Sequence, residues 1–326
     1  MFNPNIQFDV PKDRVVIGDG SASPFYLDGW LKWNEAMWSV KSERVVYTDG
    51  KSEYPRLEGV LYTDKKGRVV MPPRNPHLPF RFISTATEKR GRLASQYSTV
   101  MEIFMKDLLS RGFATSIALP PGFYDMRLFV WNNFEIVYRY TFMHKLPFDK
   151  KLIDNSITNK INKAVKNGYY ISESSDWISI AECLKDTETR KGFSHRTDVE
   201  SLILCKEFLK NNFKSYVGCS PTNEIITTGL RLITENGLVY FWSQATKKEY
   251  LNTGIVQFLH DYVLDDVYRN FNALFVDWGG ANTPPVARAK ESWGGVLVPY
   301  PLIRPKNLRY LGSVCKSYIK FTIFKR

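Results

Sequence analysis

Cysteine and histidine are scarce in this chain of 326 residues, which contains four of each. The cysteines form no Cys-x-x-Cys pair, and this spacing excludes a zinc ribbon. Such isolated cysteines are typical of a reducing compartment, in which thiols stay free. The histidines are isolated too, so we predict no metal site and no bound cofactor. The cysteines are Cys183, Cys205, Cys219 and Cys315.

Long apolar runs are also absent. No stretch approaches the ~20 apolar residues that a membrane-spanning helix needs. The start of the chain contains Asp9, Asp13, Asp19 and Asp28 and has no apolar run, unlike a secretory signal. We therefore expect a soluble, cytoplasmic protein.

Positive charge is abundant, with a net charge of +12 and a pI of about 9.4. A basic surface attracts phosphate-bearing partners such as nucleic acid, anionic lipid, nucleotide-linked substrates and coenzyme A. Dispersed lysines that only keep the protein soluble explain the same charge. The charge alone therefore selects no partner.

The length predicts two domains, and the hydrophobic patterns predict an α/β fold. A change to polar residues near 146–151 places one domain over residues 1–150 and the other over 151–326. Short strands over residues 58–62 and 68–71 flank a Lys-Lys-Gly turn in the first domain.

The order of predicted elements repeats in the two domains: a helix, a buried strand, a loop rich in proline and glycine, a short helix and a final strand. This order indicates a duplicated α/β domain. The elements cover residues 95–111, 114–119, 120–124, 125–131 and 135–142 in the first domain, and 254–270, 273–277, 279–284, 285–293 and 296–300 in the second.

A motif near the C-terminus carries a family resemblance. It reads Val276-Asp277-Trp278-Gly279-Gly280, then Ala289-Lys290-Glu291-Ser292-Trp293-Gly294-Gly295 and Val298-Pro299-Tyr300. Together with Ile161-Asn162-Lys163-Ala164-Val165-Lys166-Asn167-Gly168, and with Thr189-Arg190-Lys191-Gly192, it resembles the signature of the FemAB group of transferases. The resemblance covers roughly residues 155–300. It implies tandem GNAT-like repeats, with donor and acceptor meeting in a cleft of the second repeat.

The chain departs from that family pattern at three points. Ala289 replaces the aromatic residue that usually precedes the lysine. The phosphate-binding turn of GNAT enzymes is reduced over residues 247–254 to a single glycine, Gly254, before a helix. No long charged helical hairpin interrupts residues 155–215, so the arm that grips tRNA in some family members is absent.

Two residues are the candidate catalytic groups. Asp277 follows a buried strand, where open α/β sheets place ligands, and we expect it to position or deprotonate the acceptor. Capping of the adjacent loop is its alternative role. Lys290 matches the family lysine, which the resemblance assigns to the oxyanion or to a donor phosphate. A solvated surface charge is the alternative for Lys290.

Further residues are candidates for substrate binding. A basic helix start suits a donor phosphate, and polar groups between the halves suit an acceptor. Core packing for Trp242, ordinary surface lysines and structural ion pairs are the alternatives. The donor set is Trp242, Ser243, Gln244, Lys247, Lys248, Asn252, Thr253 and Gly254; the acceptor set is Tyr124, Asp125, Arg127, Arg139, Arg190, His195, Arg196, Gly279, Gly280 and Asn282.

These features predict an acyltransferase that moves an activated acyl or aminoacyl group to an amine or hydroxyl of a cell-envelope glycan precursor or related metabolite. We expect acyl-CoA as the donor, with aminoacyl-tRNA or acyl carrier protein as alternatives. A noncatalytic nucleic-acid-binding protein and an inactive scaffold are the rival hypotheses. The basic, aromatic tail over residues 304–326 suits either a membrane face or a last packed element.

Overall fold

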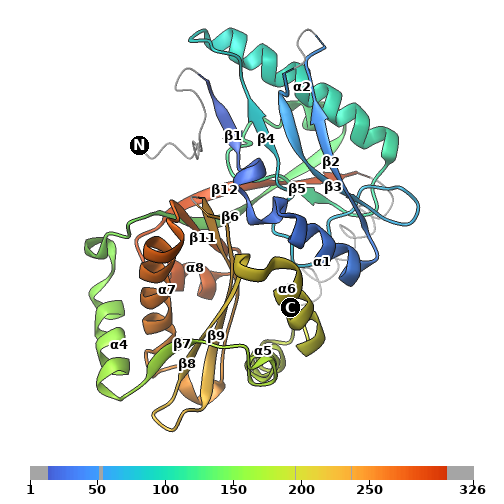
Figure 1. Cartoon of the computed structure of the whole chain (residues 1–326). Coiled ribbons are helices and arrows are strands. Elements are labelled where there is room, and N and C mark those ends of the chain that lie inside the picture. The colour runs from blue at the N-terminus through green and yellow to red at the C-terminus, as the bar shows by residue number, and fades with distance from the viewer. Residues whose placement is uncertain (1–13, 51–53, 195, 236, 307–326) are drawn as a thin grey trace, which may run out of the picture.

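The computed structural model describes residues 14–50, 54–194, 196–235 and 237–306, which form two β-sheets with helices packed on them (Figure 1). The smaller sheet has four antiparallel strands in the order β1-β4-β3-β2. Their bounds are Val16–Gly18 (β1), Lys41–Tyr47 (β2), Leu57–Thr63 (β3) and Arg81–Ile83 (β4).

The larger sheet has eight strands in the order β5-β12-β6-β11-β10-β9-β8-β7. All neighbours are antiparallel except β10 and β11, which are parallel. The strands are Ile117–Ala118 (β5), Phe134–Lys145 (β6), Tyr170–Glu173 (β7), Phe213–Cys219 (β8), Ile225–Ile233 (β9), Leu238–Thr246 (β10), Phe275–Gly280 (β11) and Val296–Pro305 (β12).

Helices cover both faces of the larger sheet. In Figure 1, α4 and α7 lie on one side of the lower strands and α5 and α6 on the other, with α1 between the two halves. In the described part of the chain, no helix is both long enough and apolar enough to cross a membrane. The helices are Asp28–Trp38 (α1), Arg90–Arg111 (α2), Arg127–Trp131 (α3), Asn155–Lys166 (α4), Trp177–Lys191 (α5), Val199–Leu209 (α6), Ile255–Phe271 (α7) and Pro284–Glu291 (α8).

The two halves repeat one order of elements. The series β2-β3-β4-α2-β5-α3-β6 of the first half matches β8-β9-β10-α7-β11-α8-β12 of the second. The predicted mixed α/β fold with tandem repeats is therefore confirmed. The boundary near residue 150 stays a prediction, and the chain passes it in a short segment between β6 and α4.

The final strands of the two repeats are exchanged. β6, which ends the first repeat, pairs with β11 of the second, whereas β12, which ends the second, pairs with β5 of the first. β6 and β12 also pair with each other over ten residues, from Val296↔Met143 to Pro305↔Phe134. Neither repeat can therefore complete its own sheet without the other.

Local sequence signals account for several element ends. Asp198 and Ser201 form a capping box at the start of α6, in which each side chain bonds to the other residue's backbone N–H. Gly112 ends α2 with a positive φ of 71°. The predicted strand over residues 68–71 is wrong, because only Val69 forms isolated bridges there. Pro72 and Pro73, which follow, have no N–H to extend a ladder.

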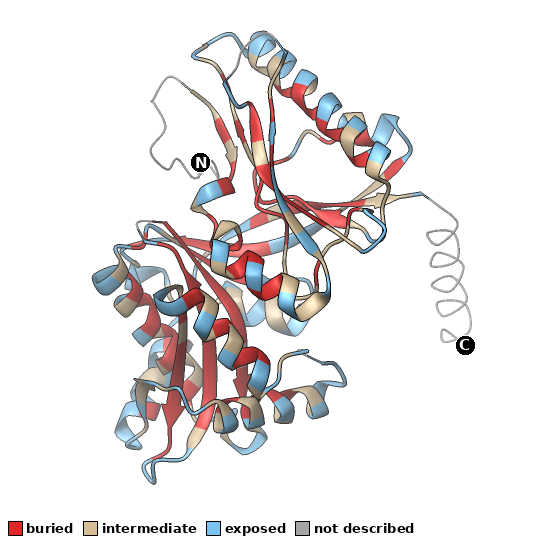
Figure 2. Ribbon diagram, turned by 45° about the vertical axis from the view of Figure 1, so that its right-hand side comes forward, coloured by how far each residue is buried: buried red, intermediate tan, exposed pale blue. Residues whose placement is uncertain are grey.

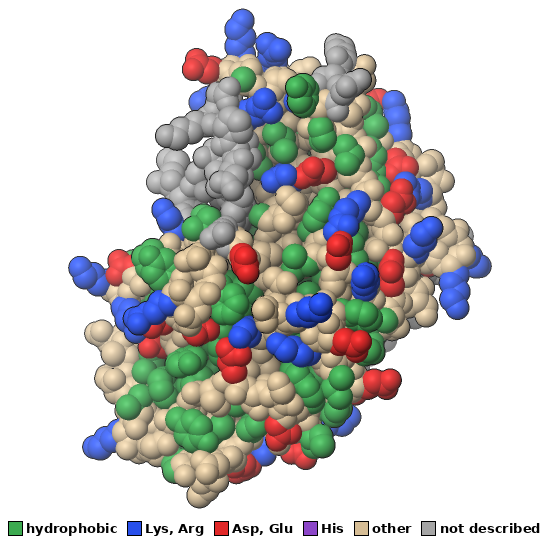
Figure 3. All heavy atoms as spheres, viewed as in Figure 1, with side chains coloured by type: hydrophobic (Ala, Val, Ile, Leu, Met, Phe, Trp, Pro, Cys, Tyr) green, Lys and Arg blue, Asp and Glu red, His purple; other side chains and the backbone are tan. Residues whose placement is uncertain are grey.

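The buried residues lie along the strands and on the inner faces of the helices, as Figure 2 shows. One core cluster fills the first repeat under α2, and two others lie on opposite faces of the second repeat's strands. On the face seen in Figure 3, Lys and Arg side chains are mixed with Asp and Glu over both halves. The net positive charge is therefore not gathered into one patch on that face.

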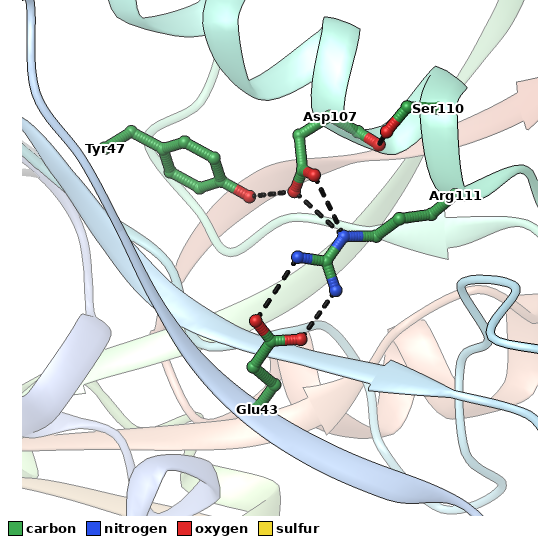
Figure 4. Close-up of polar contacts among 5 residues, drawn as sticks. All are labelled: Glu43, Tyr47, Asp107, Ser110 and Arg111. Carbon is green, nitrogen blue, oxygen red and sulfur yellow. Dashed lines mark hydrogen bonds and ion pairs between the residues drawn. The ribbon is translucent and has the colours of Figure 1, made fainter.

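A polar cluster fastens α2 to the edge strand β2 (Figure 4). The Tyr47 hydroxyl donates to Asp107 Oδ2 at 2.6 Å, and Arg111 bonds to both Asp107 and Glu43. Because Arg111 is only partly exposed and bridges two carboxylates, it lowers the pKa of Glu43. This cluster fixes the position of α2 on the first sheet.

Candidate active site

Asp277 lies on β11 and is 2% exposed. Its Oδ1 accepts a hydrogen bond from the Thr141 hydroxyl of β6 and another from the Gly279 N–H at 2.7 Å. Burial raises the pKa of Asp277 to about 6, although both hydrogen bonds favour the charged form. A carboxyl with this pKa can accept a proton near neutral pH.

Lys290 of α8 lies on the loop that follows Asp277. Its Nζ donates to the carbonyl oxygens of Trp278 at 2.5 Å, Gly279 at 3.0 Å and Gly280 at 2.9 Å. Burial lowers the pKa of Lys290 to about 8, against the opposing effect of the nearby Asp277 charge. The lysine therefore fixes the loop and stays mostly charged at neutral pH.

The strands β10 and β11 separate at this point. They pair over three residues only, from Leu238↔Phe275 to Tyr240↔Asp277. Beyond that pair, the register of β10 against β9 shifts between Phe241 and Ser243. The register of β11 against β6 shifts between Asp277 and Gly280. Asp277 thus stands where two parallel strands part, which is a place where α/β sheets expose backbone groups to ligands.

Aromatic rings fill one side of the separation. His260 of α7 stacks on Phe241 with ring centres 5.5 Å apart and lies 4.9 Å from the Trp278 ring. Trp278 also packs against Trp293, at 5.1 Å. His260 Nδ1 and Trp278 Nε1 are buried and have no hydrogen-bond partner. Unpaired polar atoms are uncommon in protein cores and are frequent at functional sites.

Arg231 is the buried charge nearest to these rings. Its guanidinium carbon lies 3.9 Å from the centre of the Phe241 ring, and its two terminal nitrogens bond to Ser243 O and Gln244 Oε1. Burial lowers the pKa of Arg231 to about 9. Sequence reasoning missed this residue, although an arginine within the apolar strand Ile225–Ile233 was a usable signal.

The first half contributes a second buried acid. Asp19, which follows β1, is 3% exposed, and the nearby Ser23 side chain and Gly20 backbone favour its charged form. Its Oδ2 lies 3.7 Å from His77 Nε2, and the His77 ring lies 6.1 Å from the Tyr300 ring of β12. Burial raises the pKa of Asp19 to about 8, with a smaller effect from the charge of Asp277. The two acids, one from each half, are thus within electrostatic reach of each other.

The predicted donor residues fall into two groups. Trp242, Ser243 and Gln244 lie on β10, where Trp242 is buried in a cluster with Trp30 and Trp33 and donates to Arg74 O. The second group, Lys247 to Gly254, precedes α7. There Lys247 pairs with Glu224 at 2.7 Å.

The start of α7 is covered by α4. A Cβ on Gly254 would lie 2.0 Å from the Lys160 carbonyl oxygen, and Lys163 donates to Asn252 O. Thr253 donates to Tyr250 O, and Lys248 begins a short 3-10 turn. The turn before α7 is therefore packed closely against α4 at Gly254.

Four predicted acceptor residues lie at the Asp277 loop. Gly279 and Gly280 are part of it, and Asn282 Oδ1 accepts from the Tyr140 N–H. Arg139 lies on β6 opposite Tyr300; burial raises the pKa of Tyr300, and the charge of Arg139 opposes that shift.

The other predicted acceptor residues lie elsewhere. Asp125 and Arg127 form an exposed ion pair at 2.8 Å, beside Tyr124. Arg190 donates to Thr246 O, and Arg196 lines a cavity of about 490 Å³ between α5 and α6. His195 lies outside the described residues. Four cavities of about 140 to 580 Å³ are evident in the described part of the chain, and none of these is lined by Asp277 or Lys290.

No protein-family model matches the chain, and no curated protein matches its sequence significantly. Solved structures do match its fold. FemX aligns with a TM-score of 0.62 at 11% identity and covers 87% of this chain and 93% of FemX. The C-terminal domain of a protein named as a lysylphosphatidylglycerol synthetase from Agrobacterium fabrum aligns at 0.53 and 8% identity, covering 86% and 89%. L-PGS from Bacillus licheniformis aligns at 0.50 and 13% identity, covering 82% and 84%.

These alignments span most of both chains, and the repeat structure described above accounts for them. The chain has the FemAB-like fold of two GNAT-type repeats.

Proposed function

We propose that this chain is an acyltransferase that moves an activated acyl or aminoacyl group to an amine or hydroxyl acceptor. The observation that carries the proposal is the position of Asp277, which is buried where β10 and β11 part and is supported by Lys290. A fold shared with FemX and with a lysylphosphatidylglycerol synthetase domain supports a transferase, and the second name supports an envelope acceptor.

In the proposed reaction, Asp277 accepts a proton from the acceptor amine or hydroxyl as that group attacks the donor carbonyl carbon. A new C–N or C–O bond forms, and the carbonyl oxygen carries the negative charge of the tetrahedral intermediate. Lys290 holds the loop after Asp277 and supplies a positive charge near the negative oxygen of the intermediate. Collapse of the intermediate breaks the bond to the donor's leaving group, which takes up the proton held by Asp277.

The donor is proposed to be aminoacyl-tRNA in preference to the acyl-CoA that the sequence suggested. Lys247 is paired with Glu224, and Gly254 lies against the Lys160 carbonyl. The ion pair offsets the charge of Lys247, and the packing at Gly254 narrows the space before α7, so both contacts make this helix start less suited to a coenzyme A diphosphate. The acceptor is proposed to be an amine or hydroxyl of a cell-envelope glycan or lipid precursor.

The test measures transfer of a labelled acyl group from acetyl-CoA, acyl carrier protein or aminoacyl-tRNA to a panel of amine and hydroxyl acceptors. In the active combination, kcat/KM should rise with pH through about 6, because Asp277 must lose its proton. It should fall again as Lys290 loses its charge above about 8. The matched control is Asp265→Asn, which removes an exposed carboxylate that pairs with Arg269 on α7. Full activity of Asp277→Asn would contradict the proposal, and so would the absence of transfer from every donor.

A further inference from the structure

The first repeat contains a cavity of about 580 Å³ that shares no lining residue with the candidate active site. Its walls come from the ends of β2, β3 and β4 and from the face of α2 that carries Arg92 and Ser95. This volume lies within the range of small-molecule sites, which is roughly 300 to 1,000 Å³. The cavity is therefore large enough for a nucleotide.

Among the described residues, three arginines and one carboxylate line this cavity. Arg56 is 4% exposed and is paired at 3.3 Å with Asp49, the one acid among these described lining residues. Arg14 has a buried Nε without a hydrogen-bond partner. Arg92 is exposed, and no described acidic side chain pairs with Arg14 or Arg92. The lining thus has an excess of guanidinium groups, whose planar donors suit the oxygens of a phosphate.

The start of α2 adds to this positive field. α2 has 22 residues, no acidic residue in its first turn and no side-chain cap. Arg90 and Arg92 instead place positive charge at the helix end that is already positive. Both effects favour an anion near this helix start.

We propose that this cavity binds the diphosphate group of a nucleotide. Arg14 and Arg92 would bond to the phosphate oxygens, and Arg56 is held beside them by Asp49. Tyr54 is 70% exposed on the lining and offers an aromatic face for the base. The site does not depend on the proposed acyl transfer, because none of its residues takes part in that chemistry.

The test is isothermal titration of the full chain with inorganic phosphate, inorganic pyrophosphate, ADP and UDP at low ionic strength. We expect the two nucleotides to bind with a Kd below about 1 mM, pyrophosphate to compete with them, and phosphate to bind ~10-fold more weakly or worse. Arg92→Gln should weaken nucleotide binding by ~10-fold or more. Ser95→Glu, which adds a carboxylate on the exposed lining of α2, should abolish it.

The matched control is Arg269→Gln on α7, the helix that corresponds to α2 in the second repeat. It removes the same charge from an exposed helical position and should leave nucleotide binding unchanged. Circular dichroism of each variant checks that the fold is retained. Three results would overturn the proposal: no binding of either nucleotide up to about 1 mM, equal weakening in Arg92→Gln and Arg269→Gln, or phosphate binding as tightly as ADP. These results do not depend on whether the chain transfers acyl groups.

Discussion

The two repeats use the same elements but differ in which strand lies beside the third strand of each series, β4 in the first repeat and β10 in the second. In the second repeat, β10 lies beside β11 and separates from it at Asp277. In the first repeat, β4 lies between β3 and β1, so the N-terminal strand occupies the corresponding edge. The two-residue strand β5 is bonded to this region through the Leu78 N–H, which donates to Ala118 O. The strand separation at Asp277 is therefore a property of the second repeat alone.

The starts of the helices α7 and α2 also differ, and here it is the first repeat that is the more open. The start of α7 is sealed against α4 at Gly254, whereas the start of α2 borders an open, arginine-lined cavity. Under the two proposals made above, the second repeat would carry the chemistry at its strands and the first would bind an anion at its helix. The following predictions test that division.

The largest expected effect is a loss of activity on substitution of Asp277, one of the two buried acids. Asp277→Asn should lower kcat/KM by ~10³-fold, the range that general-base removal produces. Asp19→Asn should leave the rate at pH 7 unchanged within a few-fold, because burial keeps the Asp19 carboxyl protonated up to about pH 8. Steady-state kinetics of both variants measures this. Equal losses in the two variants would show that the first repeat shares in the catalysis.

Stability should respond to pH in the same two variants. The folded-state pKa of Asp277 is raised to about 6 from 3.8, so the folded state binds this proton more tightly and loses stability as pH rises from about 4 to 6. Asp277→Asn should therefore gain stability relative to wild type across that window, by on the order of 3 kcal/mol. For Asp19→Asn the gain should continue to about pH 8. Urea unfolding at several pH values measures these differences, and a flat difference would contradict the burial argument.

Replacing a glycine by alanine should lower the stability of the fold at the start of α7 and raise it at the start of α2. Gly254 has a φ of 89°, and a Cβ there would meet the Lys160 carbonyl oxygen, so Gly254→Ala should destabilise the fold by about 2 kcal/mol or more. Gly67→Ala is the control, because Gly67 also has a positive φ but has open space around it. A smaller loss at Gly67 would isolate the contact with α4, and equal losses would assign the whole effect to backbone strain.

The smallest expected effect is at the start of α2. Gly91 lies in the first turn and has nothing within 4 Å of an added Cβ. Gly91→Ala should therefore stabilise the fold by about 0.5 to 1 kcal/mol, the difference in helix propensity. Thermal unfolding measures this gain. A loss of stability would indicate that the start of α2 packs more closely than the open cavity implies.

Most helices and strands could be predicted from the sequence because their hydrophobic periods are long and end at clear signals. The helix α7 and the strand β10 are examples, with Gly254 and the turn before Leu238 marking their starts. The three-residue strands β1 and β4 were missed because so short a stretch has no measurable period. The strand exchange was also beyond the sequence, since the hydrophobic pattern of β6 fits either partner equally well.

The part of the candidate site that lies within a local sequence motif could also be predicted. Asp277 and Lys290 lie 13 positions apart in a recognisable motif, and the structure places both at one loop. Asp19, His77 and Thr141 come from distant parts of the chain and carry no local signal. Their role depends on burial, which only the assembled fold determines.

The exchange of β6 and β12 has a consequence for biosynthesis. A ribosome completes the first repeat's own residues at Lys145, but the strand that borders β5 ends at Pro305. At the usual elongation rates, the 160 intervening residues take roughly 10 to 30 s to synthesise. During much of that interval β5 and both edges of β6 lack their partners, because β11 and β12 also come from the second repeat. Exposed strand edges favour pairing with other chains. The nascent chain should therefore need chaperone protection until its last strand emerges.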